Sequence, residues 1–219
     1  YLTPALIFAQ LLLTFCKVQP HELMPSLWHG WLLLFQLVSA SLVAALLIFV
    51  HMDGAYKEVF EGAMVCLICP TATAAAVITG KLGGSASSLT TYTLLSNVLA
   101  AIVVPLMFPL VEPHADITFV TAFLKILSKV FPLLLCPFFL AILPGLHHFL
   151  LGFRDLAFYL WGVALAIVTA QTVKSLVESN APVGVEVLIA LAGLVTCAVQ
   201  FYLGKRIGTR YSDRISAGQ

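Results

Sequence analysis

The stretch that decides the fold of this chain is residues 61–84, which read EGAMVCLICPTATAAAVITGKLGG. An apolar run leads into Pro70, a residue that has no backbone N–H and whose ring clashes with the preceding helical turn. Thr71 and Thr73 follow, and their hydroxyls can bond the backbone groups that the proline frees. We therefore predict two half-helices that meet near the middle of a membrane, with an ordinary proline kink as the alternative.

The composition of the whole chain indicates that this stretch belongs to a membrane protein. Of the 219 residues, 61% are hydrophobic and 10% are charged, and the mean hydropathy is +1.04. Soluble domains carry roughly 45–50% apolar and about 25% charged residues, so these few charges could not cover a soluble surface. The net charge of +1 offers no electrostatic basis for nucleic-acid binding. A polytopic membrane protein is the class that remains.

Apolar runs long enough to cross a bilayer recur along the chain, and a bilayer core needs about 20 apolar residues per helix. We predict an all-α fold, a polytopic transmembrane helical bundle in a single transmembrane domain over residues 1–219, because the short connectors leave no room for a soluble domain. The seven predicted spans are residues 2–16, 30–50, 59–80, 86–111, 122–143, 156–173 and 183–203.

Lysine and arginine are unequally divided between the two sides of this predicted bundle. Lys57 and Lys174 fall on one side. The larger group on the other side comprises Lys17, Lys81, Arg154, Lys205, Arg206, Arg210 and Arg214. Because cytoplasmic loops carry the excess of positive charge, the larger group is predicted to face the cytoplasm.

The spacing of the spans also repeats along the chain. A shift of about 155 residues places the span at 2–16 on that at 156–173, in opposite orientation, as in the inverted-topology repeats of many secondary transporters. On this interpretation residues 1–111 form a first repeat that lacks its first helix. Residues 117–219 form a second repeat, cut at the start of its broken helix. The visible spans are then seven of an expected ten, and a chance alignment of hydrophobic runs is the alternative.

Polar side chains within the predicted spans are the candidates for a binding site. Gln36 is a lone amide deep in an apolar span and needs partners there. Thr90, Thr93 and Asn97 share one helical face, which we expect to point into the bundle, for binding or for helix packing. The second half-helix would direct its free amides, near Thr71 and Thr73, towards an anion such as a carboxylate.

Catalytic and metal sites are not expected. Cys66 and Cys69 have the spacing of a redox or metal pair, but without a second pair inside a membrane helix we interpret them as packing residues. An intramembrane enzyme would need a nucleophile and a base at depth, and the best pair available is Cys69 with His51, which lies at the end of its span. Charged residues are nearly absent from the centres of the predicted spans, so the sequence gives no indication of a proton relay.

At these residues the chain resembles the bile acid/sodium symporter family, over essentially its whole length. The resemblance is carried by Cys69-Pro70-Thr71-Ala72-Thr73-Ala74, Gly84, the Ser/Thr-rich helix start after it, Pro105, residues 17–23 and Gln36. It implies ten helices in two inverted repeats. It also implies a core domain with two crossing broken helices and a panel domain that moves against it.

The resemblance further implies roles for individual residues. By position, Gln36 and Thr93 correspond to sodium ligands, and Thr73 to a threonine that contacts substrate. The chain departs from the family at Ala75, Ala76 and Leu89, where side chains with oxygen atoms are often found. Because these three apolar side chains offer no oxygen to sodium, we expect the first sodium site to be incomplete.

Together these observations predict a secondary active transporter that moves a small organic anion by alternating access in a bacterial inner membrane. Na⁺ is the only cofactor expected, and the bilayer and the anion are the expected partners, with no nucleic acid. Proton coupling, absence of coupling and a channel-like pore are the alternatives. The predicted substrate-binding residues are Thr71, Thr73, Ala74 and Asn97, and the predicted ion-binding residues are Gln36 and Thr93.

Overall fold

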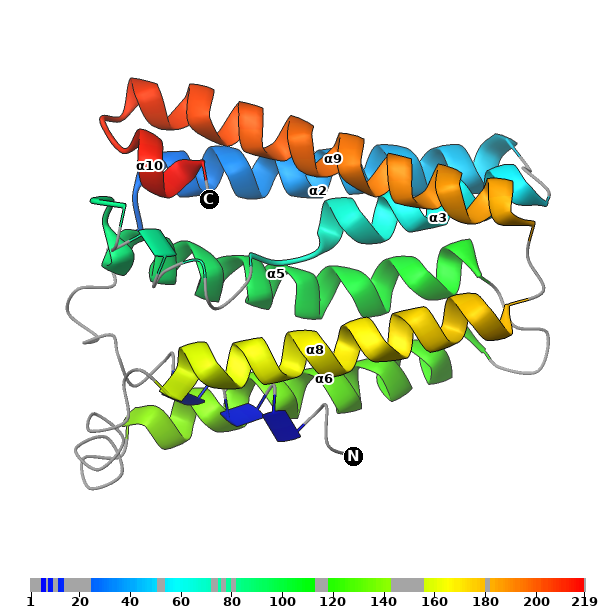
Figure 1. The fold of residues 1–219 in the computed structure, drawn as a ribbon, viewed down its shortest axis with the longest axis horizontal. Coiled ribbons are helices and arrows are strands. Elements are labelled where there is room, and N and C mark those ends of the chain that lie inside the picture. Colours follow the sequence, from blue (N-terminus) through cyan, green and yellow to red (C-terminus); the bar gives the residue numbers. More distant parts are fainter. Residues whose placement is uncertain are drawn as a thin grey trace.

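The structure is a computed structural model that describes residues 5–6, 8–9, 12–13, 25–50, 54–71, 75, 78–79, 82–112, 118–142, 156–179 and 182–218. Within these ranges the secondary structure is helical and contains no strand, as the composition predicts. The helices run side by side along the long axis of the molecule (Figure 1). They are α2 (Leu27–Val50), α3 (Ala55–Ile68), α5 (Ala86–Val111), α6 (Phe119–Ile142), α8 (Leu156–Glu178), α9 (Val183–Arg210) and α10 (Arg214–Ala217).

Four of the described helices are long and apolar enough to cross a membrane, and they confirm a helical membrane protein. They are Leu27–Val50, Ala86–Val111, Tyr159–Glu178 and Val183–Arg210. Large hydrophobic side chains are exposed along them, among them Leu42 and Leu194, as expected of surfaces that face lipid. The count of seven spans stays a prediction, since most of residues 2–16 lie outside the described part of the chain.

Helices α2, α3 and α6 begin three or four residues before their predicted starts, and two helices extend beyond their predicted ends. Helix α9 continues to Arg210, so residues 205–210, which we predicted as a connector, are helical. Helix α8 likewise continues through Lys174 to Glu178. Hydropathy detects only the part of a helix that lies within the hydrocarbon, whereas lysine and arginine favour helices and let them continue into the headgroup region.

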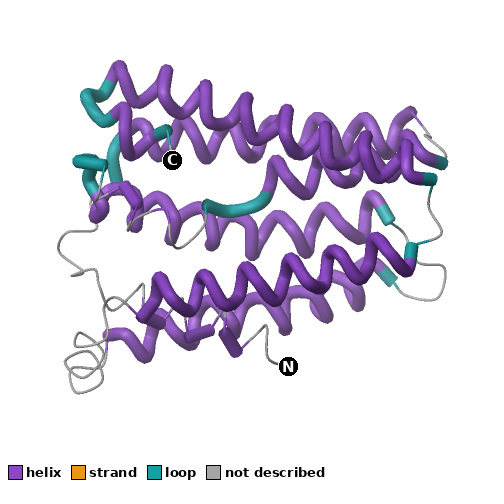
Figure 2. Tube along the Cα trace, viewed as in Figure 1, coloured by secondary structure: helices purple, strands orange, loops and turns teal. Residues whose placement is uncertain are grey.

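The predicted interruption after Cys69 is present. Helix α3 ends at Ile68, and residues 69–71 leave the helix in an extended path. Figure 2 shows this change from helix to loop about midway along the bundle. The chain is helical again at Ala75 and at residues 78–79. That second helical segment ends where the Gly84 N–H donates to the Thr79 carbonyl and Gly83 adopts a φ of +81°, the left-handed geometry of a helix C-terminus.

The half-helix α3 lies against α2 and α9, and close packing at glycines holds it there. A Cβ atom added to Gly62 on α3 would lie 3.2 Å from the Ile189 side chain. One added to Gly193 on α9 would lie 3.5 Å from the Cys66 sulfur. Small residues at such crossings let helix backbones approach closely in a membrane. Helix α5 packs against α2 and α6.

The short helix α10 folds back onto the end of α9 and also contacts α5. A Cβ atom on Gly204 would lie only 2.1 Å from the Ala217 carbonyl oxygen, and one on Gly208 would lie 2.7 Å from the Asp213 carbonyl oxygen. The backbone of α10 can therefore occupy this position only because α9 carries glycine there. Asp213 precedes α10 at the predicted helix start, although its side chain makes no capping hydrogen bond.

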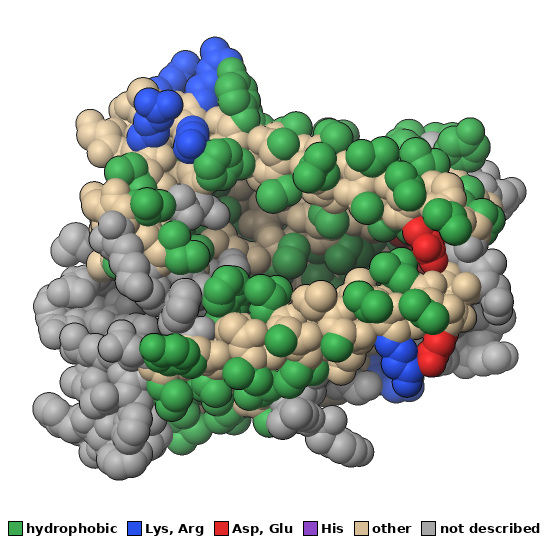
Figure 3. Space-filling model, viewed as in Figure 1, with side chains coloured by type: hydrophobic (Ala, Val, Ile, Leu, Met, Phe, Trp, Pro, Cys, Tyr) green, Lys and Arg blue, Asp and Glu red, His purple; other side chains and the backbone are tan. Residues whose placement is uncertain are grey.

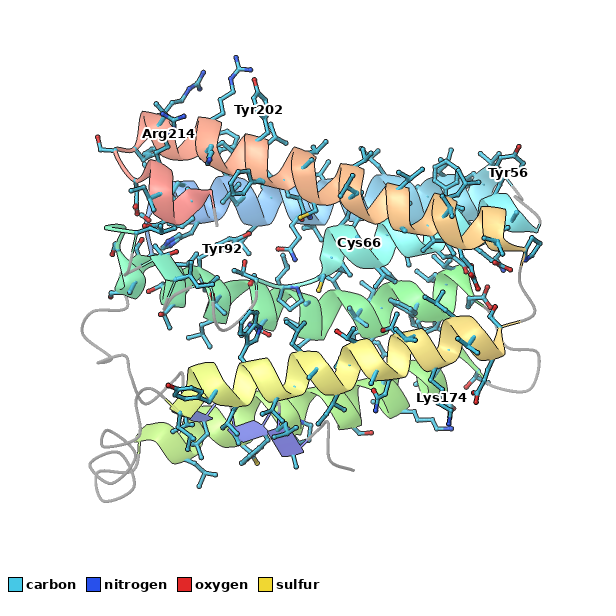
Figure 4. The ribbon with its side chains drawn as sticks, in the orientation of Figure 1. Tyr56, Cys66, Tyr92, Lys174, Tyr202 and Arg214 are labelled. Atoms are coloured by element: carbon cyan, nitrogen blue, oxygen red, sulfur yellow. The ribbon has the colours of Figure 1, made fainter. Side chains whose placement is uncertain are left out.

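Charged residues mark the two ends of the bundle. Figure 3 shows basic side chains gathered at the α10 end, and acidic side chains beside basic ones at the opposite end. Arg214 and Lys174 are labelled at these opposite ends in Figure 4. The described cations thus follow the predicted division between sides, whereas Lys17, Lys81 and Arg154 lie outside the described residues.

Candidate functional site

The interruption of α3 leaves main-chain carbonyls without helical partners. The last helical hydrogen bond runs from the Cys69 N–H to the Val65 carbonyl, at 3.0 Å. Pro70 has no N–H to continue the series. Among the described residues, no main-chain N–H beyond Cys69 donates back to α3. The carbonyls of residues 66–68 therefore need other donors, because an unpaired carbonyl away from water is costly.

Two glutamine side chains supply those donors. The Gln36 Nε2, from α2, donates to the Ile68 carbonyl at 2.8 Å. The Gln200 Nε2, from α9, donates to the Leu67 carbonyl at 3.2 Å and to the Cys66 carbonyl at 3.5 Å. The broken end of α3 is thus capped by amides from the two helices that flank it.

The other polar atom of the Gln36 side chain is its oxygen, Oε1. The Gln36 side chain is 5% exposed, and its Oε1 has no hydrogen-bond partner among the described residues. A buried polar atom left unpaired costs roughly 1–3 kcal/mol. This oxygen is therefore available to a hydrogen-bond donor or to a cation.

A cavity of about 340 Å³ lies at the break. Its walls come from α2, α3, α5, α9 and α10, and no charged side chain is among its described lining residues. Figure 3 shows the molecule hollowed on this face between α9 and α8. The polar groups of the lining belong to Gln36, Thr71, Tyr92 and Gln200, with the thiols of Cys66, Cys69 and Cys197. A neutral ligand or a desolvated ion in this cavity would be bound by the dipoles of amide, hydroxyl and thiol groups and not by an opposite charge.

Thr71 and Tyr92 join the break to helix α5. A side-chain hydrogen bond links the two residues, and both line the cavity. Cys66 and Tyr92 lie on either side of the break in Figure 4. The Tyr92 ring also packs near Trp28 and His29, with ring centroids 5.5 Å and 5.9 Å away. The Tyr92 hydroxyl is thereby held at the cavity by a buried aromatic group.

His29, which sequence reasoning did not single out, lies fully buried behind Tyr92. Its Nδ1 accepts a hydrogen bond from the Ser26 N–H at 3.0 Å, so in the neutral ring the hydrogen is on Nε2. The Nε2 atom lies 3.2 Å from the Ser88 Oγ. Both ring nitrogens are occupied, which assigns His29 to linking α2 with α5 rather than to the cavity.

Of the predicted site residues, Thr71 and Gln36 lie at the cavity, whereas Thr93 and Asn97 are not among its lining residues. Thr93 is 1% exposed and donates to the Leu89 carbonyl at 2.9 Å. The Asn97 side chain donates to the Thr93 carbonyl at 2.7 Å. The predicted residues Thr73 and Ala74 lie outside the described part of the chain, as do Ala76 and His51.

Two of the positions that depart from the family pattern lie in an apolar cluster. Ala75 and Leu89 are buried together with Trp28, Leu32 and Ala217. Their own side chains carry no oxygen that could serve as a ligand to a hard cation.

Thiols aside, Gln200 and Tyr92 are the polar residues of the cavity that sequence reasoning missed. Gln200 lies in the run Cys197-Ala198-Val199-Gln200-Phe201, where it is a single amide in an apolar span. The criterion that identified Gln36 would have identified Gln200 as well. Tyr92 carries no comparable signal, because an aromatic residue in a membrane helix is more often part of the packing.

Comparison of the chain with protein-family models, with curated proteins and with solved structures found no match. The resemblance to the bile acid/sodium symporter family therefore stays a prediction from the residues that carry it.

Proposed function

We propose that this protein is a secondary active transporter that moves a small organic anion by alternating access across a bacterial inner membrane. The observation that carries the proposal is the interruption of α3 at Cys69 beside a cavity lined by hydrogen-bonding groups. Non-helical backbone at membrane depth is tolerated where it lines a cavity or is buried in protein. Broken helices of this kind form the midplane substrate sites of many secondary transporters.

The arrangement of the helices supports a carrier with two moving parts. Helices α2, α3, α9 and α10 are connected by mutual contacts, and α5 joins them through α2 and α10. Helix α6 packs on α5, on the side away from α9 in Figure 1. A body that holds the cavity and a second body that slides against it are what alternating access requires.

The cavity chemistry supports a small polar substrate bound by dipoles. The Thr71 and Tyr92 hydroxyls are bonded to each other, and the pair keeps one O–H that can donate to a carboxylate oxygen. The free amides that the sequence predicts near Thr71 and Thr73 would add the positive end of a helix dipole. Apolar walls that include Phe35 and Phe201 would accept a hydrocarbon portion of the anion.

The unpaired Gln36 Oε1 supports coupling to Na⁺. A sodium ion needs several hard oxygen ligands, and this buried oxygen is one that the described residues leave free. Bound there, Na⁺ would supply a positive charge beside the anion. Ala75 and Leu89, whose side chains carry no oxygen, would contribute no side-chain ligand to a second ion. Thr93, whose hydroxyl donates within its own helix, keeps a lone pair with which it could accept or coordinate.

Counterflow in proteoliposomes tests the proposal. The protein is reconstituted with a high internal concentration of an unlabelled candidate carboxylate, and entry of the labelled compound is followed. A carrier gives transient accumulation that saturates with substrate. A channel-like pore, the second candidate, gives equilibration without accumulation or saturation, and that result would reject the carrier.

Replacing Na⁺ by choline in the same assay tests the coupling ion separately. Uptake driven by a Na⁺ gradient and lost in choline is expected. Equal uptake in the two media would end the sodium hypothesis and leave proton coupling or absence of coupling. The variant Thr73→Val should weaken anion binding while expression is unchanged, and unaltered affinity would count against a role of this threonine in substrate binding.

A further inference from the structure

Four cations gather at the α10 end of the molecule. They are Lys205, Arg206 and Arg210 on the last turns of α9 and Arg214 at the start of α10, and we call them the cationic patch. The patch is visible at one corner of Figure 3. It is assembled by tertiary structure, since α10 brings Arg214 back onto α9 only by packing its backbone on Gly204 and Gly208.

In the described part of the chain, the cationic patch differs from the lysines at the other end of the bundle in having no carboxylate partner. Within the described residues, no aspartate or glutamate makes a salt bridge with any of its four members. At the opposite end Lys57 is paired with Glu112 and lies 3.6 Å from Glu61, and Lys174 lies 3.7 Å from Glu178. The charges of the patch are therefore free to meet anions from outside the chain.

Aromatic side chains lie beside the cationic patch. Tyr202 is exposed, and its hydroxyl accepts a hydrogen bond from the Arg206 guanidinium at 3.5 Å. The Trp31 Nε1–H donates to the Tyr211 hydroxyl at 3.1 Å. Lys205 lies over the Phe201 ring, 4.2 Å from its centroid. Tryptophan and tyrosine concentrate at membrane–water interfaces, so these rings indicate that the patch lies at the level of the lipid headgroups.

We infer that the cationic patch binds the phosphate groups of anionic phospholipids in the leaflet at this end of the bundle. Arginine presents a planar fork of N–H donors that fits phosphate, and clusters of lysine and arginine beside a membrane helix recognise anionic headgroups. The exposed apolar surface of α9, including Leu194 and Val195, continues directly from the patch and would accommodate the acyl chains. This continuity favours a lipid over a free anion.

The test uses the whole chain in nanodiscs that contain equal amounts of phosphatidylcholine and phosphatidylglycerol. The lipids retained by the protein after release into detergent are counted by native mass spectrometry. The wild-type protein should retain phosphatidylglycerol several-fold over phosphatidylcholine, and this preference should fall as ionic strength rises. The triple variant R206Q/R210Q/R214Q should lose the preference. A double variant with cations changed elsewhere, K125Q/K174Q, should keep it.

A folded triple variant that keeps the wild-type preference would overturn the proposal, and three further outcomes would do so as well. One is a wild-type protein that shows no preference between the two lipids. Another is an equal loss of preference in K125Q/K174Q, which would show that the preference depends on the total charge of the protein and not on the patch. The third is displacement of phosphatidylglycerol by millimolar inorganic phosphate, which would show a site for a free anion. The single variants R206Q, R210Q and R214Q are measured in parallel, so a triple variant that fails to fold still leaves three tests of the patch, each expected to show a partial loss.

Discussion

Gln36 on α2 and Gln200 on α9 donate side-chain hydrogen bonds to consecutive main-chain carbonyls of α3, those of Ile68 and Leu67. Within an uninterrupted helix these carbonyls would accept from main-chain N–H groups one turn further on. Pro70 prevents that arrangement for the Cys66 carbonyl, to which Gln200 also donates. The broken helix is thus stabilised by amides from two other helices, and the cavity opens beside the residues that stabilise it.

Removing either glutamine amide should destabilise the protein. Gln36→Leu leaves the buried Ile68 carbonyl unpaired, and we expect a loss of about 1–3 kcal/mol of unfolding free energy. Gln200→Leu should cost less, because its bonds are longer and its side chain is half-buried. Thermal unfolding in detergent measures both, with Thr172→Val, which removes an exposed hydroxyl bonded within α8, as the control.

The double variant Gln36→Leu/Gln200→Leu should not be additive. Both side chains cap the same helix end, and groups that share one element show interaction energies of about 0.5–3 kcal/mol. Strict additivity in the double-mutant cycle would mean that the two amides act on independent parts of α3, contrary to the geometry described here.

Restoring an N–H at the break should reduce transport without loss of stability. In Pro70→Ala, residue 70 gains a donor for the Cys66 carbonyl, which favours one more residue of helix and competes with Gln200. A net hydrogen bond contributes about 0.5–1.5 kcal/mol, so the unfolding temperature should stay the same or rise. Counterflow should fall markedly in the same preparation.

Pro109→Ala is the matched control for that variant, because Pro109 lies inside the continuous helix α5. Its counterflow should remain close to that of the wild-type protein. Wild-type counterflow by Pro70→Ala would show that the proline at the break is dispensable for transport.

Removing the Tyr92 hydroxyl should weaken substrate binding. Tyr92→Phe keeps the ring beside Trp28 and His29 but loses the hydroxyl that bonds Thr71 at the cavity. A lost neutral hydrogen bond of about 1 kcal/mol corresponds to a several-fold rise in the apparent substrate KM. Tyr56→Phe, at the other end of the bundle and highly exposed, is the control (Figure 4). Equal KM values for Tyr92→Phe and wild type would remove Tyr92 from the proposed site.

A side chain at Gly204 should displace α10. In Gly204→Ala the new Cβ would meet the Ala217 carbonyl oxygen at 2.1 Å, so α10 must move away from α9. Because Ala217 and Gly218 line the cavity, labelling of the Cys197 thiol by a polar maleimide should become faster. Gly162→Ala, whose Cβ would have no neighbour within 4 Å, should label at the wild-type rate. An unchanged rate in Gly204→Ala would place α10 elsewhere in the membrane-embedded protein.

Much of the fold could be predicted because it depends on local chemistry. The span predicted at residues 86–111 coincides with α5, since an apolar run between polar turns has one low-energy conformation in lipid. A disturbance after Cys69 could be predicted because Pro70 lacks a donor whatever surrounds it. That it is a break rather than a kink could not, since Pro105 and Pro109 lie inside the continuous helix α5. The helical extension of α9 to Arg210 could not be predicted, because hydropathy does not detect the part of a helix that continues into the headgroup region.

The sequence by itself determined that the chain is apolar enough to require helices in a membrane, and that Pro70 disturbs one of those helices by a break or by a kink. Only the tertiary structure decided which groups meet that break. The partners of the freed carbonyls, Gln36 and Gln200, come from opposite halves of the chain, and Tyr92 reaches the cavity from a third helix. Hydrogen bonds between helices depend on how the helices pack. That packing is set by close contacts such as those at Gly62 and Gly204, and each of these contacts joins residues from different helices.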